Sequence, residues 1–154
     1  MRAIQILVVD DHELFRLTVR SFLESQPNWH LCGEAGDGIE AIEKSRALRP
    51  DVVLMDINMP RMDGLEATRI IRREIPQCKV VIVTQNHASI ARQQATNVDA
   101  QAYVTKSDFA KDLPAILQRV MGNEGGRIPQ GESLLFFSQQ VRAKELDPRT
   151  ASQR

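Results

Sequence analysis

The sequence predicts an α/β fold in which five parallel strands form one sheet with helices on both faces. Two observations support this prediction. Continuous apolar runs rich in β-branched residues, typical of strands buried on both faces, alternate with segments of helical periodicity. The connections between them are short, so strands that are joined through helices are expected to lie parallel. Because such crossovers are right-handed, a doubly wound strand order is the leading topology.

The first strand is predicted at residues 4–9, where β-branched and leucine side chains dominate. A helix follows, because apolar residues from Leu14 to Leu23 share one face, and it is expected to end near Pro27. A second strand is predicted at residues 29–35, and it ends at the glycine-rich turn 36–38.

The middle of the chain repeats this pattern. A helix is predicted over residues 39–48 and ends before Pro50, because a residue that precedes proline disfavours the helical conformation. A third buried strand is expected at residues 51–55. After a loop, another helix is predicted to continue to about Ile75, where Pro76 stops it.

The last two units are shorter. A strand is predicted at residues 79–83, a weak helix at 89–98 and a short strand at 102–104. Asp108 is expected to cap a final helix that runs to about Met121. Five such units favour the flavodoxin-like (βα)5 order among doubly wound topologies.

The chain is predicted to form one domain over residues 1–122, followed by a linker and tail over 123–154. Residues 123–131 are rich in glycine and proline, as is typical of a linker. The tail contains one candidate amphipathic helix, over residues 133–146, and a polar end that is expected to fray.

Composition and charge disfavour several function classes. Of the 154 residues, 42% are hydrophobic and 26% charged, as in ordinary globular proteins, and 20 basic residues match 20 acidic ones. A net charge of zero gives no electrostatic case for nucleic acid or an anionic membrane as partner. The apolar runs are too short to span a bilayer, there is no signal-peptide pattern, and Cys32 and Cys78 lack metal-ligand spacing. A cytoplasmic protein is therefore predicted.

Five chemically active residues follow the predicted strands: Asp10, Asp11, Asp56, Thr84 and Lys106. Because ligands of open α/β sheets bind beyond the carboxyl ends of the strands, these side chains are expected to share one pocket. Three carboxylates that close repel one another, and a hard cation such as Mg²⁺ relieves the repulsion. The alternative is that the acids only cap helices, as Asp11 could for the first helix, which is less favoured for three acids than for one.

A carboxylate, a Mg²⁺ site, a lysine and a hydroxyl together suit phosphoryl transfer. The carboxylate would attack phosphorus and become an acyl phosphate, while Mg²⁺ and Lys106 neutralise charge on the phosphoryl oxygens. Thr84 could then donate a hydrogen bond to the new phosphate. Taken singly, Thr84 also fits a strand-end packing residue and Lys106 a solvated surface charge, but their joint placement favours the pocket.

Four motifs resemble the receiver domain of two-component response regulators, the CheY-like family. They are Val8–His12, Met55–Gly64, Val83–Thr84 and Tyr103–Lys106, and the resemblance covers about residues 4–121. It implies that Asp56 accepts a phosphoryl group from a sensor histidine kinase. The chain would then be no enzyme in the usual sense, but a phosphoacceptor with self-catalysed phosphorylation and dephosphorylation.

The resemblance also assigns the remaining roles. The implied ligands of Mg²⁺ are Asp10, Asp11, Asp56 and the main chain of Asn58. The implied phosphoryl-binding residues are Thr84 and Lys106. Tyr103 matches the aromatic switch residue of the family, for which ordinary strand packing is the alternative interpretation.

The chain departs from the family pattern at several positions. Ser107 follows Lys106 where many members have proline, a variant that resembles the NarL/FixJ (LuxR-type) subfamily, whose receivers precede a helix-turn-helix. Residues 99–102 replace a frequent Gly-Ala-x-Gly, and Asp99 is expected to tolerate a left-handed helix end. Asn58 and Asn86 occupy positions thought to tune the phosphoryl lifetime, which the sequence leaves open.

The expected output is control of transcription in a full-length form. Residues 145–149 resemble the opening of an output domain, whereas the tail is too short for a helix-turn-helix, so DNA binding would need that missing domain. The alternative is a stand-alone receiver that acts through protein contacts. A homodimer is also expected, through the fourth helix, fifth strand and fifth helix, or through the first and last helices.

Three other function classes are less favoured. A phosphohydrolase of the haloacid-dehalogenase kind needs an acid two residues after its nucleophile, where this chain has Asn58. A flavodoxin-type cofactor binder needs backbone N–H groups after the first strand, where Asp10–Glu13 would repel phosphate. A degenerate receiver used only for docking is disfavoured because all five strand-end residues are present.

Overall fold

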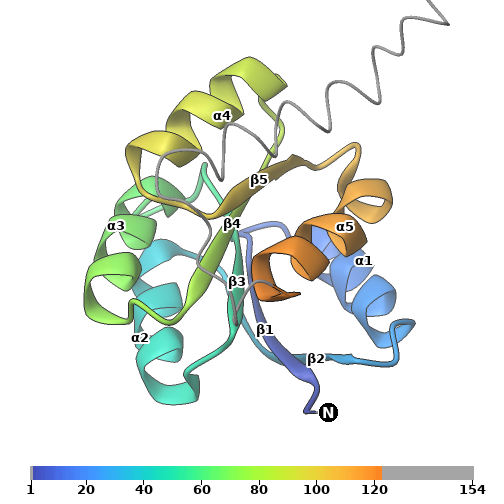
Figure 1. Ribbon diagram of the computed structural model, residues 1–154. Coiled ribbons are helices and arrows are strands. Elements are labelled where there is room, and N and C mark those ends of the chain that lie inside the picture. Colours follow the sequence, from blue (N-terminus) through green and yellow to red (C-terminus); the bar gives the residue numbers. More distant parts are fainter. Residues whose placement is uncertain (1, 123–154) are drawn as a thin grey trace, which may run out of the picture.

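The computed structural model of the protein describes residues 2–122, and the predicted linker and tail helix within 123–154 lie outside them. Strands and helices alternate along the described range (Figure 1). The elements are β1 (Ile4–Val9), α1 (Glu13–Glu24), β2 (Trp29–Ala35), α2 (Gly38–Leu48), β3 (Val52–Asp56), α3 (Gly64–Glu74), β4 (Lys79–Thr84), α4 (Ala88–Asn97), β5 (Ala102–Thr105) and α5 (Phe109–Gly122). Over the same range, no helix is long and apolar enough to cross a membrane.

The strands form one parallel sheet in the order β2-β1-β3-β4-β5. Helices α1 and α5 cover one face of this sheet, and α2, α3 and α4 cover the other (Figure 1). Because the central strands lie between two helical layers, every residue of β3 is buried, which explains the continuous apolar runs in the sequence. The predicted doubly wound (βα)5 fold is confirmed.

Two aspartates fix the starts of α2 and α3. Asp37 and Asp63 each precede the first helical residue and accept a hydrogen bond of 2.9 Å from a backbone N–H, that of Glu40 and Glu66 respectively. Each bond satisfies one of the donors that a helix start leaves without an intrahelical partner. The N-cap residue of α4, His87, makes no such side-chain bond, in agreement with the weak helix predicted there.

The departure from the usual glycine pattern before β5 does not disturb the fold. Asp99 has the left-handed backbone expected of it, with a φ of 60°. Arg72 of α3 donates a hydrogen bond from Nε to the carbonyl oxygen of Asp99 at 3.1 Å. Aspartate tolerates this conformation better than most residues, and the arginine holds the turn in place.

Gly64 brings the start of α3 directly against the end of β3. A Cβ atom at this position would lie 1.8 Å from the carbonyl oxygen of Asp56. The N–H of Gly64 also donates a hydrogen bond to the carbonyl oxygen of Ile57 at 2.8 Å. Only glycine permits this approach without movement of the backbone, so Gly64 fixes the loop that follows Asp56.

Replacing Gly64 by alanine should lower the free energy of unfolding by about 2–3 kcal/mol or more, because the backbone must move to relieve the overlap. Urea unfolding followed by the fluorescence of Trp29, the single tryptophan, measures the change. Gly122→Ala is the matched control, because a Cβ there meets no atom within 4 Å. Its stability should be unchanged or slightly higher. A Gly64→Ala protein as stable as the wild type would show that the loop adapts freely.

Candidate functional site

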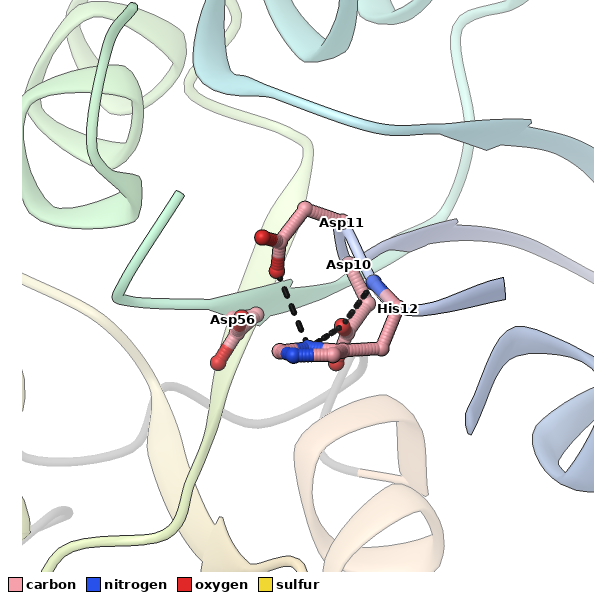
Figure 2. Close-up of side chains that lie close together, drawn as sticks. All are labelled: Asp10, Asp11, His12 and Asp56. Carbon is pink, nitrogen blue, oxygen red and sulfur yellow. Dashed lines mark hydrogen bonds and ion pairs between the residues drawn. The ribbon is translucent and has the colours of Figure 1, made fainter. Parts of the chain in front are cut away.

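The carboxyl edge of the sheet brings together side chains that are far apart in the sequence. Asp10 and Asp11 follow β1, Asp56 ends β3, and Lys106 follows β5. One ligand atom from each of the three aspartates and from His12 lies within 4.8 Å of the others. Figure 2 shows the ring of His12 beside the carboxylates of Asp10 and Asp11, with Asp56 facing them. The structure therefore gathers the three predicted acids and adds a histidine to them.

Asp10 is a buried carboxylate with three neighbours that hold it in place. Its side chain is 1% exposed, and Oδ1 accepts a hydrogen bond of 2.8 Å from the backbone N–H of His12. Its Oδ2 atom lies 2.6 Å from the Nζ atom of Lys106; it accepts no aligned hydrogen bond from residues 2–122, so this ion pair compensates its charge. Arg16 donates a hydrogen bond of 2.6 Å to the carbonyl oxygen of Asp10. Such compensation is what a buried charge requires.

Asp56 is buried as well, and its charge is less well compensated. Burial, and next the negative charge of Asp10, raise the pKa of Asp56 to about 6. Lys106 opposes this shift, with its Nζ atom 3.6 Å from Oδ1 of Asp56. Above about pH 6 the carboxylate is ionised and available as a nucleophile or as a metal ligand.

Asp11 does not cap the first helix, so the alternative interpretation of this residue is wrong. The N-cap residue of α1 is His12, and it makes no capping side-chain bond. The carboxylate of Asp11 instead lies 3.1 Å from Nδ1 of the His12 ring, on the side of the other acids (Figure 2). Asp11 thus belongs to the cluster rather than to the helix start.

Thr84 ends β4 and is 1% exposed. Its hydroxyl oxygen accepts a hydrogen bond of 3.1 Å from the backbone N–H of Asn86, and the side chain of Asn86 donates one of 3.1 Å to Gln94 of α4. The backbone of Lys106 donates to the carbonyl oxygen of Thr84 at 2.8 Å. Thr84 therefore connects the ends of two strands with the loop that begins α4.

The two remaining predicted residues lie on β5 and in the loop after β3. Tyr103 is half-buried on β5, where it pairs in register with Ile82 of β4. Asn58 is exposed in the loop between β3 and α3. The role of its main chain as a metal ligand stays a prediction.

The donor set fits a hard divalent cation. Three carboxylates supply oxygen ligands of the kind that Mg²⁺ prefers. Their combined charge exceeds that of Lys106, and the negative charge of Asp10 adds to the effect of burial in raising the pKa of Asp56. A divalent cation among these carboxylates would offset this excess of negative charge.

Two residues of α1 contribute to the site although no role for them was predicted. Arg16 reaches Asp10 while its Nε donates to Glu34 of β2 at 3.2 Å. Phe15 places its ring beneath Lys106, with 4.5 Å from Nζ to the ring centroid. In the sequence Phe15 is recognisable only as part of the apolar face of a helix, and nothing in the sequence indicates what Arg16 contacts.

Comparison with known proteins gives concordant results. Residues 6–118, which contain every strand-end residue described above, match the family described as response regulator receiver domain. Response regulator protein VraR of Staphylococcus aureus is 36% identical over 121 residues, which are 79% of this chain and 58% of VraR. The chain thus matches little more than half of the length of that relative.

Solved structures agree with these matches. The receiver domain of the response regulator NarL from Mycobacterium tuberculosis has a TM-score of 0.70 at 30% identity, with 82% of this chain and 100% of that chain covered. A DNA-binding response regulator of the LuxR family from Staphylococcus aureus has a TM-score of 0.70 at 26% identity, with 76% and 98% covered.

The raised pKa of Asp56 predicts how stability depends on pH in the metal-free protein. The unfolded carboxyl loses its proton near pH 4 and the folded one near pH 6, so stability falls as the pH rises through this window. Asp56→Asn should therefore be more stable than the wild type above pH 6, by about 1–3 kcal/mol, and the advantage should vanish towards pH 4. Urea titrations in EDTA at several pH values measure it.

The control for this experiment is Asp63→Asn, at an exposed helix cap where asparagine serves as well as aspartate. It should show no gain that grows with pH. A stability difference between Asp56→Asn and wild type that is the same at pH 4 and pH 7 would contradict the assignment of the raised pKa to Asp56.

Proposed function

We propose, since the chain belongs to the response regulator receiver domain family, that Asp56 accepts a phosphoryl group from a sensor histidine kinase and that the protein changes its surface in response. The observation that carries the proposal is the position of Asp56. It is a buried carboxylate at the end of β3, with Asp10 and Asp11 beside it and Lys106 within 3.6 Å.

In the proposed reaction, a carboxylate oxygen of Asp56 attacks the phosphorus of a phosphohistidine. The new O–P bond forms as the P–N bond breaks, and the electron pair of that bond leaves with the imidazole, which takes up a proton. Asp10, Asp11, Asp56 and the main chain of Asn58 would hold Mg²⁺. When bound, this ion offsets the negative charge that develops on the phosphoryl oxygens.

Asp56, Lys106 and Thr84 would each have a separate role in the proposed reaction. At neutral pH Asp56 is ionised and can act as nucleophile, because its raised pKa is still only about 6. Lys106 would turn from Asp10 to a phosphoryl oxygen, a short movement since it already lies near both carboxylates. Thr84 would donate its hydroxyl hydrogen to another phosphoryl oxygen.

An acyl phosphate on Asp56 fits this site better than repeated hydrolysis of other substrates does. A phosphohydrolase would need a general acid two residues after the nucleophile, and that position holds the exposed Asn58. The loop after β1 is acidic and would repel the phosphate of a flavin cofactor. We therefore propose a phosphoacceptor that catalyses only its own phosphorylation and dephosphorylation.

The surface change would begin at Thr84. Its hydroxyl oxygen accepts the Asn86 N–H at the loop before α4, and α4 has no side-chain cap of its own. If Thr84 turns to a phosphoryl group, that bond breaks and the start of α4 is freed, while Tyr103 moves into the space that Thr84 leaves. A local charge of about −2 would thereby bias a two-state element.

The proposed output is control of transcription, because one similar structure is a DNA-binding response regulator of the LuxR family. In this proposal residues 1–122 form the receiver, and 123–154 a linker and tail that lead to a DNA-binding unit. Phosphorylation would favour a homodimer through α4, β5 and α5, or through α1 and α5. A receiver that acts by protein contacts alone is the alternative.

The phosphorylation site can be tested by mass spectrometry. Wild type incubated with acetyl phosphate and Mg²⁺ should gain the mass of one phosphoryl group, and Asp56→Asn should not, because its amide is no nucleophile. Excess EDTA should abolish the gain in wild type, since three carboxylates would then repel the incoming group. Equal labelling of Asp56→Asn, or full labelling in EDTA, would contradict the proposal.

The route to α4 can be tested by amide NMR of the labelled protein. Phosphorylation should shift the amide signals of Asn86, Tyr103 and the first turn of α4, because the Thr84–Asn86 bond is lost. Thr84→Val, which keeps the shape but lacks the hydroxyl, should shift the Asn86 signal before phosphorylation and respond little afterwards. Shifts confined to the residues around Asp56 in the wild type would exclude this route.

A further inference from the structure

Lys106 lies on the face of an aromatic ring from a different element. Its Nζ atom is 4.5 Å from the ring centroid of Phe15 in α1, 2.6 Å from a carboxylate oxygen of Asp10 and 3.6 Å from one of Asp56. The lysine side chain is only 11% exposed. The ammonium group is therefore enclosed by two carboxylates and a π face, with little room for water.

We infer that Phe15 is a positioning residue for Lys106, which keeps the ammonium at the phosphoryl site both before and after phosphoryl transfer. The inference rests on the proposed function, because it concerns the lysine that would bind the phosphoryl group. It adds to the site a residue whose side chain has no polar atom.

The physical basis is the difference between a cation–π contact and an ion pair. Lysine has a long stem with four rotatable bonds, so its ammonium is poorly fixed unless neighbours confine it. The ion pair with Asp10 must be given up when the ammonium turns to a phosphoryl oxygen at Asp56. The attraction of the ring face is not directed at one hydrogen, so it persists while the ammonium turns.

The ring of Phe15 is itself held by the core. It packs edge-on against Phe109 of α5, with 5.8 Å between the centroids and an angle of 66° between the planes. Phe109 is 3% exposed. The platform beneath Lys106 is thus built by two helices on the same face of the sheet (Figure 1).

Phe22 offers a matched control within the same cluster. It lies two turns further along α1 and packs against the same Phe109 ring, at 5.2 Å and 69°. The contacts described for it are aromatic ones, with Phe109 and with Trp29. Leucine in place of either phenylalanine therefore removes an edge contact with Phe109, but only the change at Phe15 removes the π face under Lys106.

The first measurement is NMR of the ε-methylene protons of Lys106 in the full chain. Because ring currents shift protons above an aromatic face upfield, these signals should lie upfield of those of the other lysines in the wild type. The displacement should persist in Phe22→Leu and Phe15→Tyr and disappear in Phe15→Leu. Lys106 signals at ordinary positions in the wild type would overturn the inference without any variant.

The second measurement is the rate of labelling by acetyl phosphate with Mg²⁺, determined over a range of acetyl phosphate concentrations. Phe15→Leu should be about three- to tenfold slower, the range expected from the strength of a partly buried cation–π contact. Phe15→Tyr should restore the rate, because it keeps the π face, and Phe22→Leu should label as the wild type does. Urea titrations of all variants show whether the two leucine variants are equally destabilised.

The outcomes separate the inference from the proposed function. If the wild type gains no phosphoryl group, the proposed function fails. If the wild type is labelled but Phe15→Leu and Phe22→Leu are labelled at the same rate, Phe15 serves only packing and the inference fails. A selective loss in Phe15→Leu that Phe15→Tyr rescues, together with the loss of the upfield shift, supports it.

Discussion

Repulsion among three carboxylates at one edge of a buried sheet is the constraint on which the rest of the site depends. Asp10 and Asp56 are almost fully buried, and a buried charge is stable only when hydrogen bonds or opposite charges compensate it. Lys106 and the N–H of His12 compensate Asp10, whereas the pKa of Asp56 rises to about 6. The site therefore retains an excess of negative charge, which is the property that attracts a divalent cation.

The surrounding elements serve to keep this unfavourable arrangement in place. Gly64 allows α3 to begin directly against the carbonyl oxygen of Asp56, so the start of this helix packs on the end of β3. On the other face of the sheet, α1 contributes Arg16, which binds the main chain of Asp10, and Phe15, which lies beneath Lys106. The packing of α1 against α5 is thus connected to the geometry of the charged cluster, and the core and the site cannot be treated separately.

The helices around the sheet differ in how their first turns are capped, and this difference matters in the proposed mechanism. Helices α2 and α3 begin with aspartate caps, whereas α4 begins with an uncapped His87 and is preceded by a loop that Thr84 holds through one hydrogen bond. An element with few fixed contacts at one end responds to a small change in charge more readily than a capped helix does. A helix start without a side-chain cap therefore lies next to the residue that is proposed to move.

Sequence patterns alone predict the architecture and the acids and lysine of the cluster, but not its histidine. Periodicity predicts the strands and helices, and the rule that parallel strands end at one edge predicts that Asp10, Asp56 and Lys106 meet. Which groups pair within the cluster is seen only in the folded chain: Lys106 lies closer to Asp10 than to Asp56, and over the ring of Phe15. The physical reason is that periodicity shows which face of a helix is apolar but not which side chain of another element it meets. That choice depends on how α1 packs against α5 and the sheet, over distances that local sequence does not encode.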